Sequence, residues 1–458
     1  MEASRGRWPF RGWLVVLGCA MVYECSGPGH TTGINAFVDD FIRDLGISRT
    51  SVSTTWFIAS MASACSVPFA GWVFDRLGAR RMIMLLAPTY VATLLSLSRV
   101  QSWAALTACV AGLRFLGPEC CVLIATTTPQ LWFVRHRGRA NAVISVADFC
   151  LMGWPMVMSV LGKACGSWRG AYAWLAALLG GALLVALLLV ADSPEAVGLA
   201  PDDVPEEQLE QEKQPLMEPD SGGHLGGWGD GGGVDDGGGG ADKPRAPAPL
   251  EAASLRQAAH HPVFWSLGIF AACGNLFWGG FNYHAVSIVA SLGGPLAAVP
   301  EARRLGELYL PLGLAQGAVR IAMGLALDRM SPAQTVAALG WVGLAVGATS
   351  ALVLRVRTEL ALALWATAWG GLSGAQLAVQ FNVNALLFGT AALGRIQGVM
   401  LGVMVLHTGL GPLLFAGAYE RSGSYHDPML GTAALTALAA LLTLCTRPGA
   451  NKLAGRGR

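Results

Sequence analysis

The segment GWVFDRLGARR, residues 71–81, and its partial copy GLALDR, residues 324–329, decide the fold of this chain. Each copy follows a long apolar run, and each places a glycine four residues before an Asp-Arg pair. Two other dipeptides recur in the same order: Gly138-Arg139 as Gly394-Arg395, and Gly166-Ser167 as Gly423-Ser424. The three offsets are 253, 256 and 257 residues, so the sequence predicts two related halves.

The composition around these segments indicates a membrane protein. Of the 458 residues, 53% are hydrophobic and 13% are charged, and the mean hydropathy is +0.49. A soluble protein has about 25% charged residues. A membrane-spanning helix needs roughly 20 apolar residues, and twelve runs meet that need. Their limits are 13–38, 52–74, 82–100, 104–131, 140–162, 170–191, 263–290, 306–327, 333–354, 360–387, 396–418 and 429–446.

These runs are continuous rather than alternating, and lipid cannot satisfy unpaired backbone groups, so helices are expected. We predict an all-α membrane protein with twelve transmembrane helices in two six-helix parallel repeats. Glycines four residues apart, as at Gly398 and Gly402, permit close helix contact. The predicted halves are residues 1–193 and 259–458. Residues 194–258 are acidic and then glycine-rich, which predicts a disordered cytoplasmic linker.

Basic residues set the expected orientation. With the N-terminus inside, the short inner segments hold 15 Lys and Arg residues and the outer segments hold 10. Both termini are therefore expected in the cytoplasm. We expect the plasma membrane as the host, with an organelle membrane as the alternative.

Several functional classes find no support in the residues. The net charge of +2 and the lack of a basic run argue against a nucleic-acid partner. The ten cysteines show no metal-binding spacing, so no metal or other cofactor is expected. Nucleophile-elbow and phosphate-loop motifs are missing, so the chain is not expected to be an enzyme. We expect a monomer whose partners are the lipid bilayer, a small organic anion and, as an option, protons.

The segment at residues 71–81 resembles the signature loop G-x3-D-R-x-G-R-R of the major facilitator superfamily, with Ala79 in place of the usual first Arg. Parallel six-helix repeats are the arrangement of that superfamily. The resemblance implies a cytoplasmic gate in which Asp75 caps a helix end and pairs with arginines. A charged turn without that role is the alternative. The gate motif comprises Gly71, Asp75, Arg76, Gly78, Arg80, Asp328 and Arg329.

A narrower resemblance covers nearly the whole chain outside the linker. In the first half it rests on INAFVDDFIRDLGISRTSVS, LRFLGPE, WFVRHRGRANAV and GSWRGAYAW. In the second half it rests on HHPVFWSLGIF, AVRIAMGLALDR and GPLLFAGAYERSGSY. These strings resemble the monocarboxylate porter and oxalate/formate antiporter branch. The branch carries small organic anions, often lactate, pyruvate or oxalate, so the resemblance implies transport of such an anion.

Arg320 is the leading candidate for binding the anion. It lies about two-thirds along the eighth apolar run, roughly 20 Å from the outer end at 1.5 Å per residue. A charge at that depth costs on the order of 2.5–3.5 kcal/mol, which favours a functional role. A guanidinium can bind a carboxylate through two hydrogen bonds, and the branch places a substrate-binding Arg at this position. The alternative is an arginine that reaches the membrane surface or pairs with Asp328.

The proton-coupled animal carriers of this branch have an Asp one helical turn before the substrate-binding Arg. In this chain the corresponding position, one turn before Arg320, is Gln316. The Lys that the oxalate antiporter has in its eleventh span is also missing, and the nearest polar residue is His407. One fixed cation suits a single carboxylate better than a dicarboxylate. The predicted substrate-binding residues are Arg320, Gln316, His284 and His407, although each histidine also fits a packing role.

Four other charges fall inside apolar runs and are candidates for ion coupling: Glu24, Arg114, Glu119 and Asp148. A structural interpretation pairs Arg114 with Glu119 or Glu24, and Asp148 with a cytoplasmic Arg. A proton-carrying Glu24 is the functional alternative. Three functions therefore stay open: a secondary active transporter of an organic anion, a proton-coupled exporter of drugs or other metabolites, and a transporter-like nutrient sensor.

Overall fold

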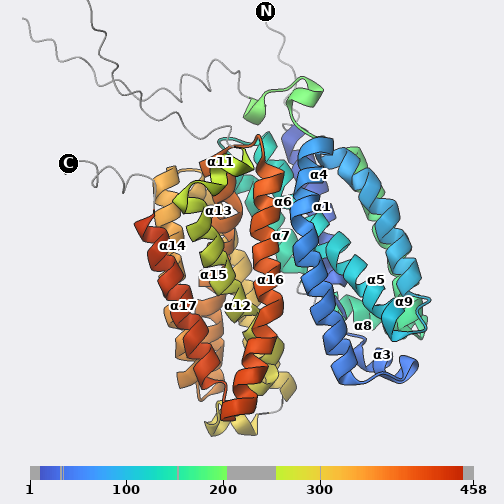
Figure 1. Ribbon diagram of the computed structural model, residues 1–458, viewed down its shortest axis with the longest axis vertical. Helices are drawn as coiled ribbons and strands as arrows, with labels where there is room; N and C mark the ends of the chain where they lie inside the picture. Colours follow the sequence, from blue (N-terminus) through green and yellow to red (C-terminus); the bar gives the residue numbers. More distant parts are fainter. Residues whose placement is uncertain are drawn as a thin grey trace, which may run out of the picture.

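The computed structural model describes residues 11–30, 33–34, 36–151, 154–203, 254–299 and 301–446. Within these ranges the regular structure is helical and forms two bundles (Figure 1). The first bundle contains α1 (Arg11–Glu24), α3 (Val38–Leu45), α4 (Arg49–Leu97), α5 (Trp103–Arg114), α6 (Val122–Trp132), α7 (Arg137–Cys150), α8 (Trp154–Cys165) and α9 (Trp168–Leu189). The second contains α11 (Leu255–Ala259), α12 (Pro262–Ser291), α13 (Glu301–Leu327), α14 (Pro332–Leu352), α15 (Glu359–Phe388), α16 (Leu393–Ser422) and α17 (His426–Cys445).

The predicted membrane spans correspond to these helices. In the described part of the chain, eight helices are long and apolar enough to cross a membrane. Among them α4 crosses twice, because Gly78 has φ 80° and ψ 171° and turns the chain back on itself (Figure 1). The segments α1, α7 with α8, and α15 complete the twelve predicted spans. Although α15 has 30 residues, its amide side chains keep it out of the apolar set.

Three spans of the first half are interrupted, which corrects the prediction of continuous helices there. The helix over 13–38 stops at Glu24 and is followed by a 3₁₀ turn, Gly27–Gly29. The fourth span contains a π-helical turn, Phe115–Cys121, between α5 and α6. The fifth span divides between α7 and α8. Prolines at positions 28, 118 and 155 accompany the interruptions, because proline lacks the N–H that a continuous helix requires.

The interrupted spans pack into one another at close range. A Cβ atom added to Gly27 would lie 2.1 Å from the Trp154 ring, and one added to Gly29 would lie 2.6 Å from the Leu113 carbonyl oxygen. Only glycine permits such an approach. The Tyr90 hydroxyl donates a hydrogen bond of 2.7 Å to the Cys25 carbonyl, which the end of α1 leaves without a helical partner.

Each half has its own buried core. One hydrophobic cluster is built from residues between 15 and 191, and two others from residues between 258 and 440. The structure also describes residues at both ends of the segment predicted as a linker. Asp202 accepts hydrogen bonds from the amides of Val134 and Arg135, and Ser254 caps α11. Residues 194–203 and 254–258 of the predicted linker thus have described structure, and residues 204–253 lie outside the described ranges.

Candidate transport path and gate

The two halves meet along α4 and α16 through small residues. Gly398 and Gly402 face α4 as their spacing predicts, because added Cβ atoms would lie 2.9 Å from the carbonyl oxygens of Val67 and Ala64, respectively. One turn earlier on α16, Gly394 meets Gly71. A Cβ added to Gly71 would lie 2.1 Å from the Gly394 carbonyl oxygen. The backbones of the two halves therefore touch at this end of the bundles.

Asp75 crosses the same boundary. Its carboxylate accepts hydrogen bonds from the backbone amides of Gly394 (2.7 Å) and Arg395 (3.0 Å), and from the Arg395 Nε at 2.8 Å. The amides are at the start of α16, where unpaired N–H groups and the helix dipole favour an anion. The side chain is about nine-tenths buried, with 10% of its surface exposed. Asp75 thus ties the first half to the second with charge-assisted hydrogen bonds.

Asp328 repeats this arrangement in the opposite direction. It follows α13 in the second half and accepts hydrogen bonds from the Gly138 amide (2.5 Å) and the Arg139 amide (3.2 Å) at the start of α7. The Arg139 Nε is 3.6 Å from its carboxylate. A Cβ added to Gly138 would lie 1.7 Å from the Gly324 carbonyl oxygen. Burial raises the pKa of Asp328, while the two backbone hydrogen bonds act in the opposite direction.

We name this end of the bundles the latch end, defined by Asp75, Gly138, Asp328 and Gly394. It is the upper end in Figure 1, where α4 bends and α16 begins, and the two bundles diverge toward the lower end. Two further hydrogen bonds join the halves. The Gln130 Nε2 donates to the Asn382 Oδ1 at 3.1 Å, and the Arg137 Nη1 donates to the Ala385 carbonyl at 3.5 Å. The latch end is closed in this structure.

Two arginines of the gate motif near Asp75 have other contacts. The Arg76 guanidinium stacks on Trp72 with its carbon 4.3 Å from the ring centroid. The Arg80 amide donates to Asp192, a residue that the sequence did not single out. The partners of Asp75 and Asp328 come instead from the other half, at Arg395 and Arg139. In the sequence the Gly-Arg pairs recur at an offset of 256 residues, close to the 253 of the Asp-Arg pairs, but this repeat does not specify which residues meet across the halves.

Arg320 lies two turns before Asp328 on α13 and has only 3% of its surface exposed. Its guanidinium carbon is 5.4 Å from the centroid of the Phe381 ring on α15. Gln316 is one turn away on the same face of the helix, and its Oε1 has no hydrogen-bond partner among the described residues. Added Cβ atoms at Gly370 and Gly374 of α15 would lie 2.3 and 2.2 Å from the carbonyls of Leu312 and Gln316. This contact fixes α13, and with it Arg320, against α15.

Other buried polar groups occur on the helices that meet between the halves. In the described part of the chain, no hydrogen-bond partner is found for the hydroxyls of Ser60 and Thr127 or for either amide atom of Gln380. A buried polar atom left unpaired costs about 1–3 kcal/mol. Water or a polar ligand between the halves would remove that cost, so these positions are consistent with a polar path.

Comparison with known proteins agrees with this architecture. The family model of the Major Facilitator Superfamily matches residues 28–302, more than half of the chain. The chain belongs to the Major Facilitator Superfamily. Among solved structures it is similar to the human organic anion transporter MFSD10 (TETRAN), with a TM-score of 0.64 and 16% sequence identity over 95% of this chain and 100% of the other. At that identity the likeness concerns the fold. The protein is thus a multi-pass membrane transporter rather than an enzyme.

The first half of this facilitator contains a buried ion pair at its π-helical turn. The Arg114 Nη2 is 3.9 Å from the Glu119 Oε1, and the two side chains are 7% and 2% exposed. Residues five apart lie roughly 140° apart around an α-helix, whereas a π turn brings them close together. The Arg114 guanidinium also stacks on Trp56 of α4, 4.5 Å from its ring centroid. The π turn therefore makes this pair possible.

Glu24 lies where α1 ends and contacts another interruption. The Trp154 Nε1, at the start of α8, donates to its carboxylate at 3.3 Å. The Gly-Pro-Gly, Gly-Pro-Glu and Gly-Trp-Pro segments in these spans were the sequence signals for the interruptions. Interrupted helices in transporters line binding sites. Asp148 belongs to α7, but its side chain lies outside the described residues.

The two candidate histidines are held by backbone groups. The His284 Nε2 on α12 is 3.1 Å from the Pro412 carbonyl of α16, and its Nδ1 is 3.4 Å from the Tyr425 hydroxyl. The His407 Nδ1 is 2.8 Å from the Val403 carbonyl on its own helix. The structure thus groups Gln316 with Arg320, whereas His284 joins α12 to α16.

Proposed function

We propose that the protein is a secondary active transporter of a small organic anion, in particular a monocarboxylate, that works by alternating access. The observation that carries this proposal is the buried Arg320 on α13, two turns from the closed latch end. A guanidinium stays charged throughout a transport cycle and forms two parallel hydrogen bonds with a carboxylate. The adjacent amide of Gln316 adds a neutral group that can donate to or accept from the same ligand.

The comparison and the sequence resemblance support an anion as the substrate. MFSD10 is described as an organic anion transporter, and the chain resembles the monocarboxylate porter branch over both halves. Near Arg320, Gln316 occupies the position where the proton-coupled animal carriers have an acidic residue. An amide at that position leaves the positive charge of the site larger than a carboxylate would. We expect this difference to favour binding of a single external carboxylate.

Alternation requires the latch end to open. In our proposal this end is cytoplasmic, with both termini on the same side, and Asp75 and Asp328 hold it shut. The two halves, residues 1–193 and 259–458, then rock about the contacts of α4 with α16 and of α7 with α13. The plasma membrane is the proposed host. Separate cores and glycine-mediated contacts both suit movement of the halves as rigid bodies.

A proton-coupled exporter is the second candidate, because buried acidic residues are a feature of the first half. Glu119 is 2% exposed and 3.9 Å from Arg114, a separation longer than a tight ion pair. Glu24 borders the interrupted first span. Either carboxylate can carry a proton, so both are also coupling candidates for an anion transporter. Asp148 keeps the same proposed role from its position in the sequence alone.

Reconstituted vesicles separate the two functions. The purified protein is placed in liposomes, and uptake of radiolabelled monocarboxylates is measured with and without a pH gradient, together with competition by dicarboxylates and cationic drugs. We expect saturable uptake of a monocarboxylate that cationic drugs do not inhibit. Drug efflux driven by the proton gradient, with no carboxylate uptake, would favour the exporter. Specific binding without any transport would favour a sensor.

A further inference from the structure

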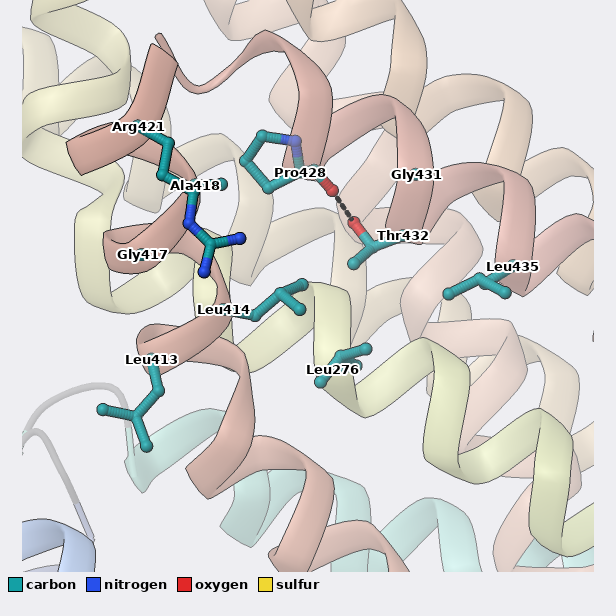
Figure 2. Close-up of a pocket in the computed structure, with 10 residues that line it drawn as sticks. All are labelled: Leu276, Leu413, Leu414, Gly417, Ala418, Arg421, Pro428, Gly431, Thr432 and Leu435. Atoms are coloured by element: carbon teal, nitrogen blue, oxygen red, sulfur yellow. Dashed lines mark hydrogen bonds between the residues drawn. The ribbon is translucent and has the colours of Figure 1, made fainter. Parts of the chain in front are cut away.

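A concave groove lies on the lateral surface of the second half, away from the latch end. Its volume is about 470 Å³, within the usual range of ligand-binding pockets. Residues of α16 and α17 form its walls, and Leu276 of α12 forms its floor (Figure 2). Both wall helices lie on the near face of the second bundle in Figure 1. In a membrane this face meets lipid.

Two glycines keep the groove open. Gly417 on α16 and Gly431 on α17 both line it, and a Cβ added to either would meet no atom within 4 Å in the described part of the chain. Helix contacts elsewhere in this protein use glycine to bring backbones together, as at Gly394. Here the glycines face empty space instead. They are therefore not explained by helix packing.

The groove is apolar along most of its length and cationic at one end. Leu413, Leu414 and Leu435 are each about half exposed, at 52%, 45% and 45%. Arg421 lies two turns beyond Leu413 on α16, which is about 12 Å along the helix axis. Figure 2 shows its side chain extending between α16 and α17 above Leu414. Among the described residues Arg421 has no carboxylate partner, so its charge is available to a ligand.

We propose that this groove binds one membrane phospholipid, whose phosphate pairs with Arg421 and whose acyl chain lies over Gly417 and Gly431. The end of α16 places Arg421 near the headgroup level, while Leu413 lies deeper in the hydrocarbon region. A guanidinium binds a phosphate through two hydrogen bonds. The inference goes beyond the transport function, because it concerns a surface that faces the lipid rather than the path between the halves.

Native mass spectrometry of the full-length protein in detergent tests the proposal, with palmitoyl-oleoyl phosphatidylglycerol as the added probe. The wild type should retain one lipid molecule at concentrations where a second is not retained. Gly417→Leu and Gly431→Leu should each abolish this retention by filling the groove. Arg421→Gln should raise the lipid concentration needed for half occupancy by about tenfold, as expected for loss of a charge-assisted pair.

Two matched controls separate the groove from the general lipid shell. Gly181→Leu adds the same side chain on α9, where a Cβ also meets no atom within 4 Å. Arg355→Gln removes an exposed cation from the same end of the second bundle. Both controls should retain the lipid as the wild type does. Equal loss in Gly181→Leu would show a non-specific effect and overturn the proposal.

The headgroup is tested with a neutral diacylglycerol of the same chains and with inorganic phosphate alone. The diacylglycerol should bind about tenfold more weakly than the phospholipid, and free phosphate should not be retained. Equal binding of the diacylglycerol would contradict the role of Arg421, and retention of free phosphate would contradict the acyl-chain site. Size-exclusion profiles confirm folding of each variant. If Gly417→Leu does not fold, Gly431→Leu tests the same groove from α17.

Discussion

The two halves share a repeat but hold their buried cations differently. In the first half, Arg114 has Glu119 on its own helix, brought within 3.9 Å by a π turn. In the second half, Arg320 lies on the continuous helix α13 beside Phe381, with Gln316 one turn away. In the first half a carboxylate five residues away pairs with the buried arginine, whereas in the second half the side chain one turn before the buried arginine is an amide. We infer that Arg114 is a structural or coupling residue and that Arg320 is the substrate-binding residue.

The largest effect is expected when the first-half pair is broken. Arg114→Gln leaves Glu119 buried without its cation, which should destabilise the fold by about 3–5 kcal/mol. Expression and thermal unfolding in detergent measure this loss. The double variant Arg114→Gln with Glu119→Gln should recover most of the stability, because no uncompensated charge remains. No recovery in the double variant would contradict a simple ion pair.

Transport by the double variant then shows whether Glu119 has a role in coupling or only in structure. If Glu119 carries a coupling proton, the double variant should fold but lose accumulation driven by a pH gradient. If the pair is only structural, gradient-driven uptake should match that of the wild type. In either case the affinity for the carboxylate should change little, because the proposal assigns substrate binding to Arg320.

The two latch carboxylates allow a second comparison. Asp75 has the Arg395 Nε at 2.8 Å, whereas the Arg139 Nε is 3.6 Å from Asp328. A hydrogen bond to a charged group contributes about 1.5–3 kcal/mol. Asp75→Asn should therefore shift the population toward the latch-open state more than Asp328→Asn, and both should slow transport. Accessibility of a cysteine introduced at the buried Thr127 of α6, which makes none of the latch contacts, measures the shift. Equal accessibility in both variants and the wild type would remove the latch role.

The interrupted spans of the first half should tolerate added volume less well than the continuous spans of the second. Gly27→Ala would force a methyl group into the Trp154 ring, and overpacking of this kind costs about 1–3 kcal/mol. Gly268→Ala in α12 meets only the Met400 sulfur at 3.8 Å and should be neutral or slightly stabilising. Thermal unfolding compares the two. Equal stability would mean that the interruption relaxes easily.

The smallest effect is expected from a deletion in the segment that connects the two halves. Residues 222–240 are glycine-rich with few apolar residues, and such a chain contributes little burial. Its deletion should leave expression and uptake nearly unchanged, because a linker of the remaining length can reach roughly 30 Å between the halves. Failure of the second half to insert in the deletion variant would contradict the division into two halves.

Much of the fold follows from the sequence, because its strongest signals are long-range repeats and apolar length. The offset between Asp75 and Asp328 predicts the parallel halves, and hydropathy predicts the spans. Hydropathy does not register backbone breaks, so it does not predict the interruptions near Glu24 and Glu119. The prolines and glycines beside them were visible, but an apolar run with one proline still reads as a single span.

The candidate site is harder to predict from the sequence than the fold. Arg320 and Gln316 are one turn apart, so their proximity follows from helical spacing alone. The cross-half partners of Asp75 depend on how two distant segments dock, and no local pattern specifies that contact. The open groove at Gly417 could not be told from a packing glycine, because both have the same sequence signature.

The most direct test of the central claim is competition by an acid and its methyl ester at Arg320. In wild-type proteoliposomes the ester should compete poorly with the labelled monocarboxylate, because it lacks the charge that the guanidinium binds. Arg320→Lys should weaken affinity by roughly ten- to hundred-fold, and Arg320→Gln should weaken it further, with Arg355→Gln as the surface control. Equal competition by acid and ester, or full uptake in Arg320→Gln, would contradict carboxylate binding at Arg320.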